Sequence, residues 1–336
     1  MRADAARTIA CVALAAASCG VLPIEPDAEE ATPIDVPAPA TLSAMAAIIP
    51  YVPHVVVNLD AVQWTAPRAE SLKRLADRWG ADEDELLALN PCLADEEVDA
   101  GEQIVVYRYE PDTVSRSVGA PNRGRIEYSA PFPEGDAWRL RGFRPRSYAT
   151  RQTVRELVSV LTEWHEVYPE AQRVKLGEFS KRGGGRVRPH KSHRTGRDVD
   201  IGYVMLEADE GHRFTRATAD NLDAAATWGL VHRLLASGSV EAIFMDARVQ
   251  ALLVPHASAT LSDEEQQAIF SSLAVEARAK KKAPIRAWGG HDDHMHVRFS
   301  CTDADTQCRA AVSRKKRKRK RRRKGKKSRS RKKSGR

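Results

Sequence analysis

The stretch HKSHRTGRDVDIGY, residues 190–203, combines polar and apolar residues at the spacing of a β-strand. Alternate side chains of a strand share one face, so Asp198 and Asp200 should lie together on a polar face. The opposite, apolar face consists of Val199, Ile201 and Tyr203. Before this strand, the Thr-Gly pair at 195–196 should turn the chain so that His193 returns beside Asp200. The segment therefore predicts a strand that brings a histidine and a carboxylate together.

A second stretch, WGGHDDHMHVRF at residues 288–299, has the same alternation. In an extended strand His294 and His296 point to one face. Met295 and Val297 then point to the opposite face, toward a core. If the fold brings the two stretches side by side, they present one shared polar patch.

Histidine nitrogens and carboxylate oxygens, without thiolate, form the ligand set of a metal site. Zinc suits this set best, while manganese, iron and nickel are admissible. A catalytic zinc ion needs three protein ligands and an open position for water, which two neighbouring strands can supply. A lone histidine is usually an ordinary buried or surface residue, but a His-x-His pair with a third histidine and an in-phase aspartate favours a metal. The sequence therefore predicts a metal site, with zinc as the expected ion.

Two patterns in these stretches carry a resemblance to a known family. His-x-x-His-x-x-Gly-x-x-x-Asp begins at residue 190, and His-x-x-His-x-His begins at residue 291. Together they resemble the penicillin-insensitive murein endopeptidases, which belong with the D-Ala-D-Ala metallopeptidases, the lysostaphin-like enzymes and the hedgehog domains. The segments SRSVGAPNRG at 115–124 and GEFSKRGGG at 177–185, and the pair Cys301 and Cys308, also resemble this family. The resemblance covers roughly residues 112–310.

The resemblance implies a role for each residue of the polar patch. The implied zinc ligands are His193, Asp200 and His296. The other implied site residues are His294 as the catalytic partner, and His190 and His291 as auxiliary residues that line the active site. The implied reaction is hydrolysis of the D-alanyl to meso-diaminopimelyl cross-link of peptidoglycan by a metal-activated water. Two alternatives stay open, a D,D-carboxypeptidase acting on peptidoglycan stems with the same metal constellation and a noncatalytic murein-binding envelope protein.

Apolar periodicity in the same region predicts an α+β fold. Helical stripes lie at residues 154–164 and 222–235, and residues 240–245 have the composition of a strand. Strands and helices do not alternate regularly, which favours an antiparallel sheet over a doubly wound one. The resemblance implies a zinc peptidase domain of the hedgehog or D-Ala-D-Ala peptidase type. We assign this domain to residues 111–312.

A separate small domain is predicted at residues 51–110. Its expected elements are strands around 55–64 and at 103–107, a helix at 72–79, and a second helix that Asp82 caps and that ends at Leu89. This βααβ order resembles a LysM module, and such modules bind the N-acetylglucosamine chains of peptidoglycan. Residues 68–71, Arg-Ala-Glu-Ser, replace the usual Gly-Asp-Thr before the first helix. The alternative is therefore a domain that only packs against the enzyme.

The N-terminus is typical of an export signal. Two arginines precede an apolar, alanine-rich stretch at 8–17, which is too short to span a bilayer as a permanent helix. We expect a signal peptide at 1–19, with either ordinary cleavage or lipidation at Cys19. Residues 20–50 are rich in proline, alanine and acids and should form an extended linker. The protein is then expected in the periplasm or as an outer-membrane lipoprotein, where a disulfide between Cys301 and Cys308 is favoured over free thiols or a metal pair.

Positive charge is concentrated at the C-terminus. Residues 314–336 contain 18 Lys or Arg and no acid, so the rest of the chain has 36 basic against 45 acidic residues. The net charge of +9 therefore reflects the tail, and a nucleic-acid partner is not expected for an exported chain. We expect residues 313–336 to form a disordered basic tail that binds anionic envelope polymers. Beyond the signal, no segment is apolar enough to predict a transmembrane helix.

Overall fold

The computed structural model of the chain describes residues 55–57, 60–79, 81–93, 97–141, 144–207 and 211–311. The predicted signal peptide at 1–19, linker at 20–50 and basic tail at 313–336 lie outside these residues. Among the helices that the structure describes, none has both the length and the apolar character needed to cross a membrane.

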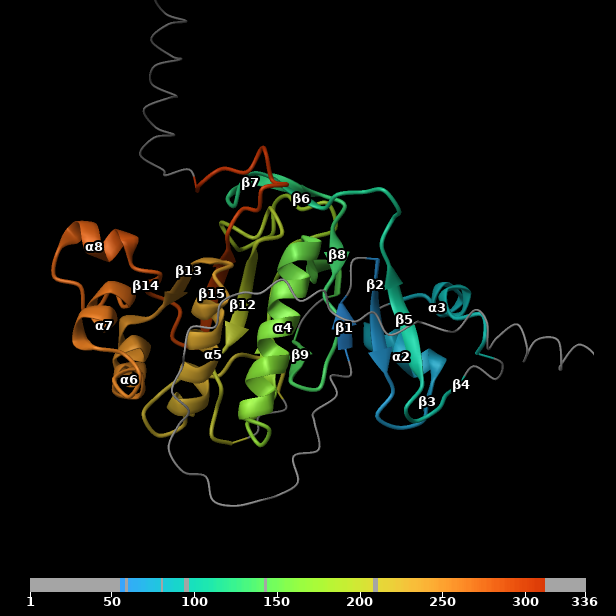
Figure 1. Cartoon of the computed structure of the whole chain (residues 1–336), viewed down its shortest axis with the longest axis horizontal. Coiled ribbons are helices and arrows are strands. Elements are labelled where there is room, and N and C mark those ends of the chain that lie inside the picture. The colour runs from blue at the N-terminus through green and yellow to red at the C-terminus, as the bar shows by residue number, and fades with distance from the viewer. Residues whose placement is uncertain are drawn as a thin grey trace, which may run out of the picture.

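A six-stranded mixed sheet forms the centre of the fold (Figure 1), with the strand order β14-β13-β15-β12-β11-β9. Its strands are β9 (Trp138–Leu140), β11 (Val174–Leu176), β12 (Asp198–Gly202), β13 (Val240–Met245), β14 (Ile285–Ala287) and β15 (His294–Phe299). The four central strands pair antiparallel, whereas β9 and β14 join the two edges in parallel. The structure has helices and a mixed sheet in which most strand pairs are antiparallel. It therefore agrees with the predicted α+β class and with the predicted preference for antiparallel pairing.

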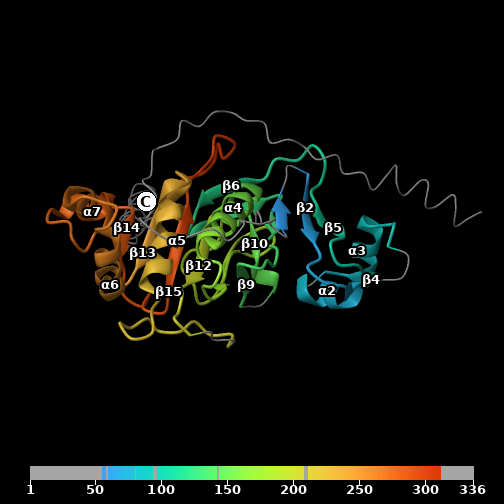
Figure 2. The same cartoon turned by 60° about the horizontal axis from the view of Figure 1, so that its bottom comes forward.

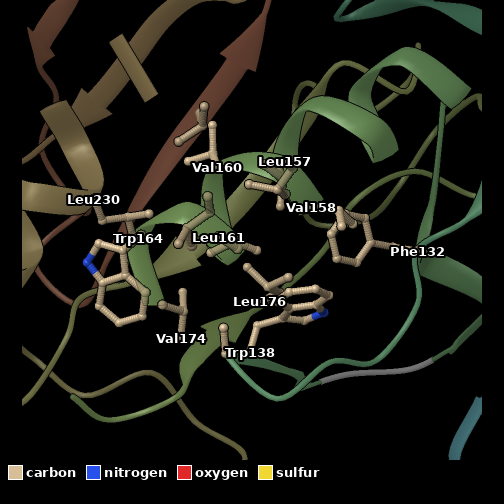
Figure 3. Packing of buried hydrophobic residues seen from close by; sticks show 14 of the residues in the cluster. Phe132, Trp138, Leu157, Val158, Val160, Leu161, Trp164, Val174, Leu176 and Leu230 are labelled. Atoms are coloured by element: carbon tan, nitrogen blue, oxygen red, sulfur yellow. The ribbon is translucent and has the colours of Figure 1, made fainter. Parts of the chain in front are cut away.

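Two long helices, α4 (Arg151–Val167) and α5 (Ala224–Ala236), lie against one face of this sheet (Figure 1, Figure 2). Thr150 begins α4, because its side-chain oxygen accepts a hydrogen bond from the backbone N–H of Thr153. The apolar stripe of α4 packs on side chains of β9 and β11 (Figure 3). Helix α4 contains the predicted stripe at 154–164, and α5 contains most of the predicted stripe at 222–235. Further helices are η1 (Arg144–Arg146), α6 (Ala247–Ala257), α7 (Asp263–Ile269) and α8 (Ala277–Lys282).

Two short strand pairs lie outside the large sheet, and one of them contacts the loop that follows β15. Strand β6 (Arg116–Ala120) pairs with β7 (Arg123–Glu127), and β8 (Ala130–Pro131) pairs with β10 (Tyr148–Ala149). Cys301 and Cys308 form the predicted disulfide. Asp305, inside the loop that this disulfide closes, accepts a hydrogen bond from the backbone N–H of Ser117. The loop after β15 is thereby fixed to β6.

The described part of the N-terminal region has the two expected helices and five short strands where two were expected. Its elements are β1 (Val55–Val57), β2 (Ala61–Thr65), β3 (Glu70–Ser71), α2 (Leu72–Trp79), α3 (Glu83–Leu89), β4 (Glu97–Val98) and β5 (Gln103–Arg108). Asp82 caps α3 by accepting hydrogen bonds from the backbone N–H groups of Asp84 and Glu85. The single strand expected around 55–64 is instead two antiparallel strands, with Val55 opposite Trp64. This folding back allows Trp64 to be buried in the core.

The N-terminal region and the large sheet share one hydrophobic core. Val62, Leu75 and Leu86 are buried in the same cluster of side chains as the apolar stripe of α4. At the start of α4, the guanidinium of Arg151 lies 4.3 Å from the centre of the Tyr109 ring. Apolar burial and this cation–π contact therefore both hold the N-terminal region against α4.

We predict that Leu161→Ala lowers the free energy of unfolding by about 3 kcal/mol, because it removes buried methyl groups and leaves a cavity. Leu161 is fully buried in the stripe of α4. Urea unfolding at neutral pH measures the loss. Glu166→Ala on the exposed face of the same helix is the control and should change stability by no more than about 0.5 kcal/mol. Equal losses in the two variants would contradict the assigned core.

Candidate metal centre

The pairing of β12 with β15 places the two histidine stretches side by side. Asp200 lies directly opposite His296, and Gly202 lies opposite His294. Met295 and Val297 are fully buried in the core, as is the apolar face of β12. The predicted alternation is confirmed in both strands, and it leaves Asp200 and His296 in contact on the polar face.

A tight turn brings His193 back to Asp200. His193 has a φ of +57° and Gly196 a φ of +71°, both in the left-handed region that favours glycine. A Cβ at residue 196 would lie 2.7 Å from the backbone nitrogen of Thr150, so only glycine fits there. The Nδ1 atom of His193 donates a hydrogen bond to the carbonyl oxygen of Phe179 at 3.0 Å. This bond orients the ring so that Nε2 faces Asp200.

The Nε2 atom of His193 is buried and has no hydrogen-bond partner among the described residues. It lies 3.2 Å from Oδ1 of Asp200, outside hydrogen-bond geometry. A buried nitrogen without a partner costs free energy, whereas a metal ion would accept its lone pair. Metal-binding histidines commonly donate their other ring N–H to a backbone carbonyl or a carboxylate, as His193 does. The residues around this atom therefore fit a metal ion.

His190, His193 and Asp200 each place one potential ligand atom within 4.8 Å of the others. Nδ1 of His190 lies 3.5 Å from Oδ2 of Asp200, and its Nε2 lies 3.7 Å from the carboxylate of Glu178. Burial, followed by the charge of His193, lowers the pKa of His190. A neutral imidazole is the form that binds metals. These three residues form a possible metal-binding triad.

His296 lies between two carboxylates. Its Nδ1 is 2.9 Å from Oδ1 of Asp200, and its Nε2 is 2.9 Å from Oδ1 of Asp198. Burial acts to lower the pKa of His296, but these hydrogen bonds outweigh burial and raise the pKa to about 9. The ring of His296 is also 4.6 Å from that of His193, centre to centre. The three residues expected as zinc ligands thus meet around one oxygen of Asp200.

His294 and His291 complete the histidine cluster. Nδ1 of His294 pairs with the carboxylate of Asp293, and its Nε2 lies 3.9 Å from Oδ1 of Asp200. The ring of His291 lies 4.8 Å from that of His294. Burial, with the charge of His294 next, lowers the pKa of His291 to about 4. All six site residues expected from the sequence therefore lie in one cluster.

Three further residues of the site were not predicted as site residues, namely Glu178, Asp198 and Arg298. Asp198 is fully buried and accepts hydrogen bonds from Nε of Arg298 at 2.7 Å and from the backbone N–H of His193 at 3.2 Å. Burial acts to raise the pKa of Asp198, but Arg298 and His296 hold it well below its usual range. Strand alternation placed Asp198 on the polar face without showing its partners. The signal for Glu178 was its place in the family-like segment at 177–185, which did not assign it a role.

Aromatic side chains border the histidine cluster. Phe214 stacks on His294, with 5.0 Å between ring centres and 17° between ring planes. Phe244 lies edge-on to His296 at 5.4 Å and edge-on to Trp288 at 5.6 Å. Trp288 is 57% exposed. The polar centre is therefore bounded by apolar rings, one of which is open to solvent.

A family profile described as penicillin-insensitive murein endopeptidase matches residues 117–320. No curated protein matches the chain. The matched residues make up more than half of the chain and include both histidine stretches with the strands β12 and β15. Membership of such a family indicates peptidoglycan hydrolysis, and the triad of two histidines and one aspartate provides a possible metal site for it. The chain belongs to the penicillin-insensitive murein endopeptidase family.

Proposed function

We propose that the protein is a zinc-dependent endopeptidase that cleaves the D-alanyl to meso-diaminopimelyl cross-links of murein. The observation that carries this proposal is the buried Nε2 of His193, which faces Asp200 and has no hydrogen-bond partner among the described residues. Family membership supplies the substrate class, because the family name specifies a murein endopeptidase. An unsatisfied imidazole nitrogen beside a buried carboxylate supplies the reason for a metal.

The zinc ligands in this proposal are Nε2 of His193, the carboxylate of Asp200 and Nδ1 of His296. His190 is the other histidine near Asp200, but it faces the second carboxylate oxygen and pairs with Glu178. His296 is favoured because Asp198 holds its Nε2 and Nδ1 is directed at Asp200. Nδ1 would release its proton when the ion binds. Three protein ligands with an open fourth position are the usual set of a catalytic zinc ion.

When bound, zinc would polarise the scissile carbonyl and lower the pKa of a bound water to about 7. His294 would act beside it. Since Asp293 holds Nδ1 of His294, the ring presents Nε2 toward the centre. This nitrogen can take a proton from the attacking water or donate a hydrogen bond to the developing oxyanion. The reaction needs no serine nucleophile, which accounts for the penicillin insensitivity in the family name.

We also propose a division into a LysM-like domain at 51–110 and a peptidase domain at 111–312 of the hedgehog or D-Ala-D-Ala peptidase type. The LysM-like domain is supported by the two short helices that lie between β2 and β5 in the chain. The strands β2 and β5 are neighbours in one sheet. Support for the peptidase domain is the antiparallel pair β12 and β15, which carries most of the candidate site. A murein substrate supports the further proposal that the protein is exported and acts in the periplasm or as an outer-membrane lipoprotein.

We predict that the purified protein holds one zinc ion per chain and that His296→Ala loses it, whereas His294→Ala retains zinc and loses most of its turnover. The difference arises because a residue outside the ligand set can transfer protons without holding the ion. Metal analysis and hydrolysis of a soluble cross-linked muropeptide measure the two effects. Unchanged zinc content in His296→Ala would refute the ligand assignment, and equal zinc loss in both variants would refute the separate role of His294.

The same assay decides between the two peptidase activities. A cross-linked dimer and a pentapeptide monomer are incubated separately with the enzyme, and the products are identified by mass spectrometry. An endopeptidase converts the dimer to monomers. Release of D-alanine from the pentapeptide, with the dimer left intact, would establish a D,D-carboxypeptidase instead.

We predict that Asp198→Ala weakens zinc affinity about 10- to 100-fold, because Asp198 orients the ring of His296 and holds the backbone of His193. Competition with a chromophoric chelator measures the affinity. Asp303→Ala, which removes an exposed carboxylate, is the matched control and should leave zinc affinity unchanged. Equal affinities in the two variants would show that Asp198 does not support the site.

We predict that the protein binds glycan strands from which an amidase has removed the stem peptides. Peptide-free glycan offers no substrate to the peptidase site, so retention would come from the LysM-like domain. Sedimentation of His294→Ala protein with these strands measures binding, and N-acetylglucosamine oligomers should compete for it. Binding to intact sacculi but not to peptide-free strands would mean that residues 51–110 only pack against the enzyme.

A further inference from the structure

The connection from β12 to α5 passes the histidine cluster and is held there by three cations. The carbonyl oxygens of three consecutive residues, 211–213, accept hydrogen bonds in turn from Arg139 at 3.1 Å, Arg141 at 2.6 Å and Lys175 at 3.1 Å. Arg139 and Lys175 lie on β9 and β11, and Arg141 directly follows β9. The backbone that leads into Phe214 is therefore anchored to the edge of the large sheet.

Two glycines leave room for the Phe214 ring. A Cβ at residue 177 would lie 2.6 Å from Cζ of Phe214, and a Cβ at residue 202 would lie 3.0 Å from its Cδ1. Any larger residue at these positions would push the ring away. The guanidinium of Arg141 lies 4.0 Å from the ring centre and adds a cation–π contact. The chain thus fixes the position of one half-buried aromatic ring from several directions.

This ring is the stacking partner of His294. The two rings lie 5.0 Å apart and nearly parallel, at 17°. Asp293 holds Nδ1 of His294, so it determines which nitrogen points to the centre. Phe214 restricts the plane of the imidazole. Together these two contacts leave Nε2 of His294 3.9 Å from Oδ1 of Asp200.

We propose that Phe214 is a positioning residue for His294: its stacked ring holds the imidazole plane in which Nε2 faces the reaction centre. The inference rests on the proposed function, in which His294 handles a proton or the oxyanion. Proton transfer depends steeply on geometry, since a misplacement of about 1 Å can cost on the order of 100-fold in rate. Phe214 acts through His294, the site residue on which its ring stacks.

The test uses full-length zinc-loaded protein and a soluble cross-linked muropeptide. Phe214→Leu keeps apolar volume but lacks a flat face, so we expect kcat to fall roughly 10-fold, with KM changed less than about 2-fold and zinc content unchanged. Phe214→Tyr restores a stacking ring and should recover most of the lost kcat. Leu206→Ala, on the same connection and exposed, is the control and should keep wild-type kcat. Thermal unfolding of each variant reports on the fold.

A double-mutant cycle with His294→Ala separates this inference from the proposed function. If Phe214 acts through His294, adding Phe214→Leu to His294→Ala causes no further loss of kcat. The inference would be overturned if Phe214→Leu lowered kcat 10-fold both in the wild-type protein and in the His294→Ala variant. It would also be overturned if Phe214→Leu lost zinc or kept wild-type kcat. If instead His294→Ala alone keeps full turnover, the role of His294 in the proposed function fails. Should Phe214→Leu unfold, Phe214→Met replaces it in the same cycle.

Discussion

The antiparallel register of β12 against β15 is the constraint on which the site depends. It sets Asp200 opposite His296, and it buries Met295 and Val297 on the other face. Because side chains alternate with a period of two, a slip by one residue would turn the carboxylate and imidazole into the core and the apolar side chains out of it. Burial of each large apolar side chain contributes about 1.5–3 kcal/mol, so the core itself selects the register that assembles the ligands.

Buried charge in the site is tolerated because each group has partners. Asp198 is fully buried and accepts from His296, from Arg298 and from the backbone of His193. An isolated carboxylate at this position would be costly, whereas a satisfied network becomes rigid in a low dielectric. By contrast, Nε2 of His193 is buried 3.2 Å from Oδ1 of Asp200 and has no hydrogen-bond partner in the described part of the chain. A metal ion would satisfy this nitrogen, which the hydrogen bonds of the site leave unsatisfied.

Packing links the N-terminal region to the site through the start of α4. Arg151 stacks on Tyr109, and its neighbour Thr150 both caps the helix and donates its backbone N–H to the carbonyl of Gly196 at 3.1 Å. Gly196 belongs to the turn that returns His193 to Asp200. The geometry of the site therefore depends on packing well outside the two strands, including the anchored connection that carries Phe214.

By itself, the sequence determined the features that depend on local periodicity. The alternation around Asp200 and His296 specified two strands with one polar face, and the glycine at 196 specified the turn, because these patterns depend on neighbouring residues. The tertiary structure alone decided the partners of Asp198, the contact of Glu178 with His190 and the stacking of Phe214 on His294. These contacts join segments as far as 100 positions apart, and only the packed core determines which of the compatible polar and aromatic residues meet.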